Sequence, residues 1–409
     1  MSTDPSIDEV LTDADVLVVS HGYQTFTKNQ VDRLAERVNS VHVLVRYNRI
    51  ADIGEYLPIR RLKPHRRSAR IDRTDQPDNV TVIPMPLWYL PIDRHYRKLG
   101  EKHYEAVRET VAGLPTEFDL IHAHFTWTAG YAAVRLGQER DIPTVLTVHE
   151  NEQWLAELAE DGPEGVYETW RGADAIVRVN EKDVPMLAAF NDDVYSVPNG
   201  FSRAEFPSYD RDEARETLGV SAETDLVFGL GGMRRRKRWH HLIDAMAVLD
   251  DRRTDVRCVL AGQGPEVRAF RDRVADRNLS DVVDVRGYLP QEEVALWMNA
   301  ADVFCLPSAS EGNPTVLFEA LGCGTPYVGT RAGGVPEILP SDDYGLTCEP
   351  DRPERLVEIL DEGLSREWDR EAIRTYGEQF TWGRIVDQLV DEVYAEVLKE
   401  PDVQRIAGM

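Results

Sequence analysis

Short runs of β-forming apolar residues alternate with longer helical patterns from one end of the chain to the other. This alternation is typical of parallel sheets whose strands are joined by helices, and nearly continuous apolar runs indicate strands covered on both faces. The first half predicts strands over Val16 to Ser20, Val41 to Tyr47, Val80 to Met85, Leu120 to His124, Thr144 to Val148 and Ala175 to Val179. The second half predicts strands over Leu226 to Leu230, Cys258 to Ala261, Val283 to Arg286, Val303 to Pro307, Tyr327 to Thr330 and Gly345 to Cys348.

The alternation is interrupted once, by turn residues between Val197 and Pro207, and restarts with a helical pattern from Asp212 to Leu218. A chain of 409 residues also exceeds the size of a single hydrophobic core. We therefore predict an α/β fold of two facing, Rossmann-like, doubly wound domains. Open sheets of this kind bind ligands at the carboxyl ends of their strands, so a cleft between the domains is the expected functional site.

The composition and the amino-terminal sequence limit where the protein can work and what it can bind. No apolar run reaches the ~18 residues of a membrane span, and the acidic amino terminus lacks a signal-peptide layout, so we expect a cytoplasmic protein. The formal charge of −25 argues against general nucleic-acid binding. Only seven of the 47 basic residues are Lys, a balance that resembles proteins of salt-loving microbes such as halophilic archaea. The four cysteines show no close pairing and are expected to be buried thiols rather than disulfides or metal ligands.

The most informative segment runs from Ser308 to Pro326. Asn313 is a good helix N-cap and Pro314 suits the first helical position, so we expect a helix to begin directly after the preceding strand. Its free amides would form an anion site, with Glu311 just outside the helix and Glu319 further along it. Pro314 and Glu319 are separated by about 7.5 Å of helix axis, which is about the distance from a diphosphate to its ribose. If a diphosphate binds the free amides, one acid can therefore meet a transferred sugar and the other the ribose.

Glu311 and Glu319 are separated by seven residues and are followed by the segments 322–326 (GCGTP) and 333–337 (GGVPE). This block closely resembles the retaining glycosyltransferase family 4, which has the GT-B fold. The resemblance implies that Glu311 approaches the donor sugar and that Glu319 binds the ribose. It also places Gly312, Asn313 and Thr315 at the donor.

The same resemblance assigns the domains and the last helix. Residues 1–200 correspond to the acceptor-binding domain and residues 201–380 to the nucleotide-sugar-binding domain. Residues 381–409 resemble the family's final helix, which crosses back to the first domain. Without the family block, the two glutamates would be interpreted as solvated helix-end acids.

A basic run leaves one predicted strand of the second domain and includes Arg234 and Lys237. Basic side chains there can stabilise the charge of a diphosphate leaving group. Lys237 matches the family pattern, but Gly232 occupies the usual position of the arginine. We therefore assign Arg234 to this role, and Arg235 and Arg236 remain alternatives. A solvated basic face is the simpler interpretation of any one of these arginines.

Several loop residues are assigned by resemblance alone. His149 matches the family histidine that contacts the donor sugar, whereas His122 or His124 is expected to support the fold or the acceptor. The remaining donor-binding assignments, each also compatible with an ordinary turn, are Gly22, Gly262, Gly264, Tyr288 and Leu289.

The resemblance also implies a mechanism. The anomeric configuration is retained without a covalent enzyme intermediate, and the departing phosphate takes the proton of the acceptor, so no dedicated base is required. The D-x-D pattern at Asp13 and Asp15 lies before the first strand, away from the expected diphosphate, so we predict no cofactor and no dependence on metal. Nucleotide-sugar epimerases, sugar phosphorylases and a non-catalytic binding protein of the same fold are the alternatives.

Residues 46–73 hold nine basic residues against three acids, in contrast to the acidic chain. An apolar segment with Trp88 follows. Basic clusters beside Trp and Leu suit the surface of an anionic membrane, so we expect an acceptor carried on a lipid such as a polyprenyl phosphate, at the inner face of the cell membrane. A basic loop paired with the acidic body explains the cluster equally well. The residues assigned to this surface are Arg60, Arg61, Arg66, Arg67 and Trp88.

Overall fold

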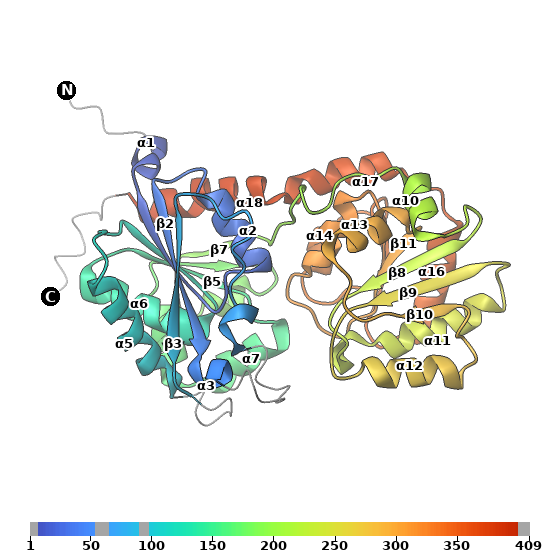
Figure 1. Cartoon of the computed structure of the whole chain (residues 1–409), viewed down its shortest axis with the longest axis horizontal. Helices are drawn as coiled ribbons and strands as arrows, with labels where there is room; N and C mark the ends of the chain where they lie inside the picture. Colours follow the sequence, from blue (N-terminus) through green and yellow to red (C-terminus); the bar gives the residue numbers. More distant parts are fainter. Residues whose placement is uncertain (1–6, 54–64, 90–97, 400–409) are drawn as a thin grey trace. The chain divides into compact units, whose positions relative to one another are not determined.

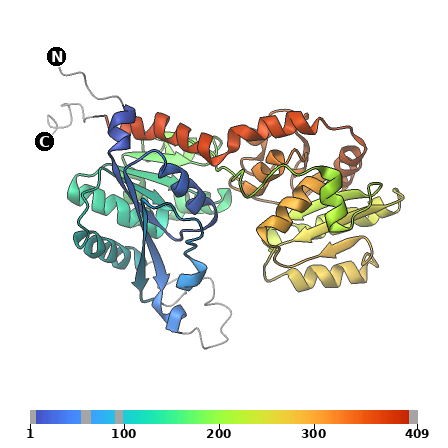
Figure 2. The same ribbon diagram turned by 45° about the horizontal axis from the view of Figure 1, so that its top comes forward.

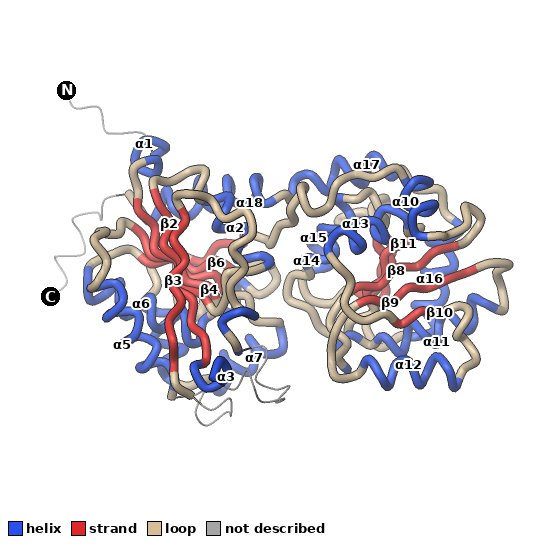
Figure 3. The backbone as a smooth tube through the Cα atoms, viewed as in Figure 1, coloured by secondary structure: helices blue, strands red, loops and turns tan. Residues whose placement is uncertain are grey.

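The computed structural model describes residues 7–53, 65–89 and 98–399, and the chain divides into two compact units. Unit 1 comprises Met1–Pro198 together with Trp382–Met409, and unit 2 comprises Asn199–Thr381. Each unit contains one parallel sheet with helices on both faces (Figure 1, Figure 3). No helix among the described residues is long and apolar enough to cross a bilayer.

The sheet of unit 1 has seven parallel strands in the order β3-β2-β1-β4-β5-β6-β7. The strand order changes direction between β1 and β4, which makes this pair the topological switch point. The strands are β1 (Asp15–Ser20), β2 (Ser40–Asn48), β3 (Val80–Leu87), β4 (Leu120–His124), β5 (Thr144–Val148), β6 (Ala175–Arg178) and β7 (Val194–Ser196).

Alternate side chains of β1 enter two different cores. Val16 and Val18 pack with α2 and α18, whereas Leu17 and Val19 pack with α5, α6 and α8 on the opposite face. This alternation explains why the strand is continuously apolar. The helical segments of unit 1 are α1 (Ile7–Thr12), α2 (Thr25–Leu34), α3 (Arg49–Ile53), η3 (Arg67–Ala69), α5 (Leu99–Ala112), η4 (Thr126–Gly130), α6 (Tyr131–Arg140), α7 (Glu152–Asp161), α8 (Glu164–Gly172), α9 (Val184–Leu187), α18 (Trp382–Leu389), η7 (Val390–Tyr394) and α19 (Ala395–Val397).

The sheet of unit 2 has six parallel strands in the order β10-β9-β8-β11-β12-β13, with its switch point between β8 and β11. Its strands are β8 (Asp225–Leu230), β9 (Val256–Ala261), β10 (Val283–Val285), β11 (Val303–Leu306), β12 (Tyr327–Thr330) and β13 (Gly345–Cys348). Its helical segments are α10 (Arg211–Leu218), η5 (Arg235–Lys237), α11 (Trp239–Asp250), α12 (Val267–Asp276), α13 (Gln291–Ala300), α14 (Thr315–Gly322), α15 (Val335–Ile338), α16 (Pro353–Ser365), α17 (Arg370–Gly377) and η6 (Glu378–Phe380).

Helix α18 packs on the sheet of unit 1 although it is far from the strands of this sheet in the sequence. Trp382, Ile385 and Leu389 are buried in the same core as Val16 and Val18. Figure 2 shows this segment in red along the top of unit 1, and α18 packs against α2. An apolar stripe at helical spacing thus completes the core of unit 1.

Every strand predicted from the sequence is present, with ends that differ by at most two residues. The structure adds β7, which the sequence analysis missed. All three residues of β7 are only partly buried and the strand lies at the sheet edge, so it lacks the apolar run that marks the other strands.

Candidate active site

The switch point of unit 2 carries a buried ion pair. Lys237 ends the short 3₁₀ helix after β8, and Glu311 lies in the loop after β11. The Lys237 Nζ atom donates to Glu311 Oε1 at 2.5 Å, and both side chains are more than nine-tenths buried. The carboxyl ends of adjacent parallel strands meet at one sheet edge, which explains how two residues so far apart in sequence form a pair.

Arg236 joins this pair from its exposed side. Its guanidinium donates to Glu311 Oε2 at 3.2 Å and to the Ser310 carbonyl at 2.8 Å. Burial opposes ionisation of Glu311, but the charges of Lys237 and then Arg236 outweigh it and lower the pKa of the carboxyl. Glu311 is therefore an ionised carboxylate with two cationic partners.

The arginine assigned from the sequence does not join the pair. Arg234 and Arg235 are exposed, and neither guanidinium makes a hydrogen bond or ion pair to a residue that the structure describes. Arg236 provides the second cation instead. A run of five consecutive basic residues, from Arg234 to Arg238, does not show which side chain the tight 3₁₀ turn directs toward Glu311.

The helix after Glu311 begins differently from the prediction. Pro314 is the N-cap residue of α14, Thr315 is the first helical residue, and no side chain caps this end. The prediction that Asn313 caps the helix was wrong: its Oδ1 accepts the Asn199 backbone N–H at 2.9 Å, which attaches the start of unit 2 to this loop. The first amides of α14 still lack partners within the helix, as in any α-helix.

Glu319 lies one turn into α14 and is partly buried. Burial raises the pKa of its carboxyl to about 8, and the negative charge of Glu205 adds to the shift. Glu319 is therefore largely protonated at neutral pH and can donate a hydrogen bond as well as accept one. The two glutamates of the motif thus have opposite protonation states.

Glycines allow four loops, those after β8, β9, β11 and β12, to pack backbone against backbone at this edge. A Cβ on Gly262 would lie 1.9 Å from the Gly231 carbonyl oxygen, and one on Gly264 would lie 2.2 Å from that of Met233. Gly333 has φ +59°, and its Cβ would lie 2.1 Å from the Glu311 carbonyl oxygen. The Gly312 carbonyl accepts the Gly334 amide at 2.9 Å. Gly333 and Gly334 thus hold the Glu311 loop, while Gly262 and Gly264 hold the loop that leads to Lys237.

Tyr288 and Leu289, in the loop after β10, differ in environment. The Tyr288 side chain is 69% exposed, whereas Leu289 is partly buried against the core of unit 2. Tyr288 offers an exposed aromatic face at the carboxyl edge of the sheet. Leu289 anchors the loop.

In unit 1, the corresponding sheet edge carries neutral histidines. His149 follows β5 and packs against the rings of Phe26 and Phe125. Its Nε2 lies 3.0 Å from Nδ1 of His124, the last residue of β4. Burial is the largest cause that lowers the pKa of His149, and burial lowers that of His124 to about 3, so both rings are neutral.

His122 supports the fold, in agreement with one of the sequence alternatives. Its Nε2 bonds Thr147 Oγ1 on β5 at 2.7 Å, and its Nδ1 bonds the hydroxyl of Tyr394 at 2.7 Å. The second contact connects β4 to the segment after α18.

Gly22 lies in the loop after β1. A Cβ added at this position would lie 3.2 Å from the Arg70 carbonyl oxygen.

Sequence reasoning missed the residue that holds the backbone around His149. Arg178, the last residue of β6, is fully buried and donates through Nη1 to the carbonyls of Val148 and Glu150, both at 2.8 Å. Asp183 pairs with this guanidinium at 2.5 Å. A charged residue that ends an otherwise apolar strand was the available signal.

The residues assigned to a membrane surface are only partly described. Arg60 and Arg61 lie outside the described residues. Arg67 is exposed, Arg66 is partly buried, and Trp88 is 58% exposed at the end of β3.

The sequence predictions about thiols and D-x-D can be compared directly with the structure. All four cysteines are free and buried, as predicted. Asp15 lies at the amino end of β1, opposite the ligand edge, and its Oδ1 accepts hydrogen bonds from Asn39 and Ser40. Among the described residues, no group of three His, Cys, Asp or Glu side chains could hold a metal ion.

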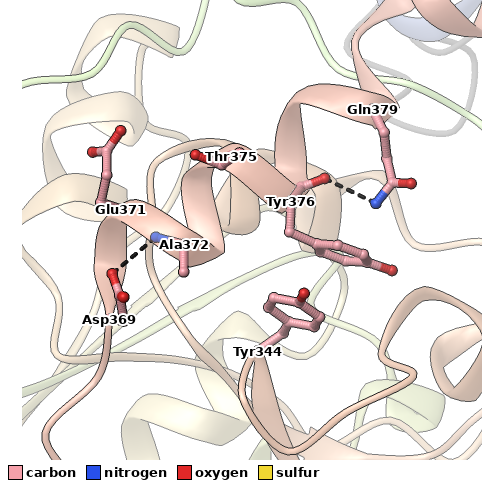
Figure 4. Close-up of a pocket in the computed structure, with 7 residues that line it drawn as sticks. All are labelled: Tyr344, Asp369, Glu371, Ala372, Thr375, Tyr376 and Gln379. Carbon is pink, nitrogen blue, oxygen red and sulfur yellow. Dashed lines mark hydrogen bonds between the residues drawn. The ribbon is translucent and has the colours of Figure 1, made fainter.

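A separate hollow on unit 2 lies beside α17 (Figure 4). The rings of Tyr344 and Tyr376 stack there with centroids 3.8 Å apart. None of the residues predicted for the donor site lines it. The lining residues are Tyr344, Asp369, Glu371, Ala372, Thr375, Tyr376 and Gln379.

Two doubly wound units with ligand-facing edges of this kind define the GT-B architecture, in agreement with comparisons to known proteins. Residues 20–205 match the model described as "Glycosyltransferase Family 4", and residues 210–380 match "Glycosyl transferases group 1". The chain belongs to this class of glycosyltransferases.

The individual matches differ in how much they cover. A D-inositol 3-phosphate glycosyltransferase of Pseudarthrobacter chlorophenolicus is 32% identical over 248 residues, which are 57% of this chain and 59% of that protein, less than two thirds of its length. The sucrose-phosphate synthase of Thermosynechococcus elongatus is 21% identical with a TM-score of 0.73, and covers 94% of this chain and 99% of that one. Anabaena Alr3699/HepE, solved with UDP-glucose, is 18% identical with a TM-score of 0.66, and covers 94% and 100%. Both structures share the fold.

Proposed function

We propose that the chain transfers a hexose-type sugar from a nucleotide-sugar donor to a glycan or lipid-linked acceptor, with retention of the anomeric configuration. The observation that carries this proposal is the buried pair of Lys237 and Glu311 at the switch point of unit 2. An ammonium fixed there can stabilise the charge that develops on a departing diphosphate. The amino end of α14 adds backbone N–H donors in the same loop.

The rest of the donor fits the remaining side chains of this edge. Glu311 approaches the sugar, while Glu319, one turn into the helix, bonds the ribose hydroxyls through a largely neutral carboxyl. Arg236 supports the charge of the diphosphate beside Lys237, and Arg234 remains a further candidate for contact with the phosphates. The UDP-glucose in the related Anabaena structure is consistent with a donor of this class.

The transfer itself needs positioning more than acid–base chemistry. The departing phosphate takes the proton of the acceptor hydroxyl on the face where the new bond forms, so the enzyme supplies alignment and electrostatic stabilisation. We also propose that this reaction does not depend on metal. Complete loss of turnover in EDTA, restored by Mg²⁺, would refute this part.

The proposed acceptor is carried on a lipid phosphate, which would place the protein at the cytoplasmic face of the cell membrane in cell-surface glycan biosynthesis. Arg67 and Trp88 offer the exposed basic and aromatic groups that such a surface requires. Flotation with anionic liposomes in high KCl tests the idea. Binding should fall when Arg60, Arg61, Arg66 and Arg67 are replaced by Ser, and no binding by the wild type would refute it.

The donor and the reaction can be identified together. The protein is incubated in molar KCl with UDP-, GDP- and dTDP-sugars, with and without a membrane lipid extract, and nucleotide release is followed. We expect lipid-dependent release from one donor, strongly reduced in Glu319→Ala, and a product with the anomeric configuration of the donor. Donor binding without release under every condition would support a non-catalytic protein instead, and interconversion of the sugar on its nucleotide would indicate an epimerase.

A further inference from the structure

Two histidines on neighbouring strands of unit 1 share a single hydrogen bond. Nδ1 of His124 and Nε2 of His149 are 3.0 Å apart, and the ring planes differ by 15°. The ring centroids are 5.3 Å apart, so the rings meet at their edges. Both rings are neutral, so one nitrogen of this contact carries the proton and the other accepts it.

Either His124 or His149 can be the donor in this contact, and the opposite side of the His124 ring shows which one it is. Its Nε2 is buried and has no hydrogen-bond partner. If His149 were the donor, His124 would have to carry its own proton on Nε2, which would leave a buried N–H group unpaired. If His124 is the donor, its Nε2 is only an unprotonated acceptor. Orphaned buried N–H groups are rarer in proteins than unsatisfied acceptors.

We infer that His124 is a positioning residue that donates from Nδ1 to His149 Nε2 and so fixes the proton of His149 on Nδ1. His149 then offers a hydrogen-bond donor, not a basic nitrogen, to a bound oxygen atom. That this oxygen belongs to the donor sugar rests on the proposed function; the tautomer itself does not.

The environment of His149 favours a single ring orientation. Phe26 and Phe125 pack against its ring with centroids 4.7 and 5.0 Å away. The buried guanidinium of Arg178 holds the carbonyls on both sides of it. With the ring and the backbone fixed, the remaining variable is the position of the proton, which His124 controls.

The tautomer can be read directly from the ¹⁵N chemical shifts of the imidazole rings in the full-length, donor-free protein. Protonated and unprotonated ring nitrogens differ strongly in shift, and His149→Gln and His124→Gln identify the signals. We expect His149 to show a protonated Nδ1 and an unprotonated Nε2. The reverse pattern would overturn the inference, whether or not the proposed transfer reaction is found.

A matched pair of variants tests whether His124 is the cause. The amide of His124→Asn lies at the position of Nδ1 and can still donate to His149 Nε2, so Nε2 should stay unprotonated. The ionised carboxylate of His124→Asp can only accept, so Nε2 should become protonated. His122→Gln, which loses contacts to Thr147 and Tyr394 instead, should leave the His149 signals unchanged. The same His149 state in the Asn and Asp variants would refute control by His124, and if the Asp variant does not fold, the wild-type spectrum alone decides.

Discussion

The two sheets place very different chemistry at equivalent edges. At the edge of unit 1 lie neutral rings: His21 stacks on Phe125 with centroids 5.2 Å apart, and His124 bonds His149. At the switch point of unit 2, Lys237 and Glu311 form a buried ion pair. The shared topology determines where ligands can bind, while the local charges determine which ligand groups can be bound there. The neutral rings of unit 1 suit sugar hydroxyls, because the buried Arg178 beside them is already bonded to Asp183 and to backbone carbonyls. The cation fixed at the switch point of unit 2 suits a diphosphate.

The largest effect should come from breaking the ion pair. Lys237→Met leaves the buried Glu311 carboxylate with Arg236 as its remaining cation, and we expect a loss of about 3 kcal/mol in the free energy of unfolding of unit 2. The double variant Lys237→Met, Glu311→Gln should lose less than the single variant, because no buried charge remains. Denaturation followed by fluorescence measures both. A double variant less stable than the single one would contradict a charged pair.

The two edges should also respond to pH in opposite directions. Burial lowers the pKa of His21, His122 and His149, so these rings are neutral in the folded protein but become charged in the unfolded chain below about pH 6.5. Their contribution to stability is present above that pH and is lost as the pH falls. Hydrogen exchange of residues 120–130 and 144–150 should therefore accelerate from pH 7 to pH 5. Exchange that slows toward pH 5, after correction for the intrinsic rate, would be inconsistent with neutral histidines.

Glu319 gives unit 2 the opposite response. Its pKa is about 8 in the folded protein and near 4.5 in the unfolded chain, so its stabilising contribution is complete below pH 4.5 and is lost as the pH rises to 8. Glu319→Gln keeps the neutral form at every pH. We expect its melting temperature to exceed that of the wild type at pH 8, with a difference that shrinks toward pH 5. A constant difference would mean that the Glu319 pKa is ordinary.

The smallest effect concerns the loop between the two glutamates. Asn313→Ala removes the acceptor of the Asn199 amide and should destabilise unit 2 by about 1 kcal/mol. Chemical denaturation measures the loss. A helix-capping role would predict faster hydrogen exchange at the first amides of α14, whereas the observed contact predicts faster exchange at Asn199.

The sequence predicted the sheets because each buried strand is an apolar run. It assigned Lys237 and Glu311 to the site because each matches the family pattern in its own segment, but it did not predict that they pair. It did not predict which basic residue joins them, because a 3₁₀ turn directs Arg236 toward Glu311 and leaves Arg234, which is also exposed, without a bond to it. The contact between His124 and His149 was also inaccessible, since it depends on the register of β4 against β5. Arg178 was missed because two of its partners are backbone carbonyls, which leave no pattern in the sequence, so a charged residue at the end of an apolar strand was the available signal.

The most direct test of the central claim is nucleotide release by wild type, Lys237→Met and Arg235→Met with the donor and lipid acceptor identified in the screen. Arg235 is a neighbouring exposed cation and serves as the matched control. We expect Lys237→Met to lower kcat about 10²-fold or more and Arg235→Met to leave it nearly unchanged. Equal rates for all three proteins, with each shown to be folded, would mean that the buried pair of unit 2 is not where the donor is cleaved.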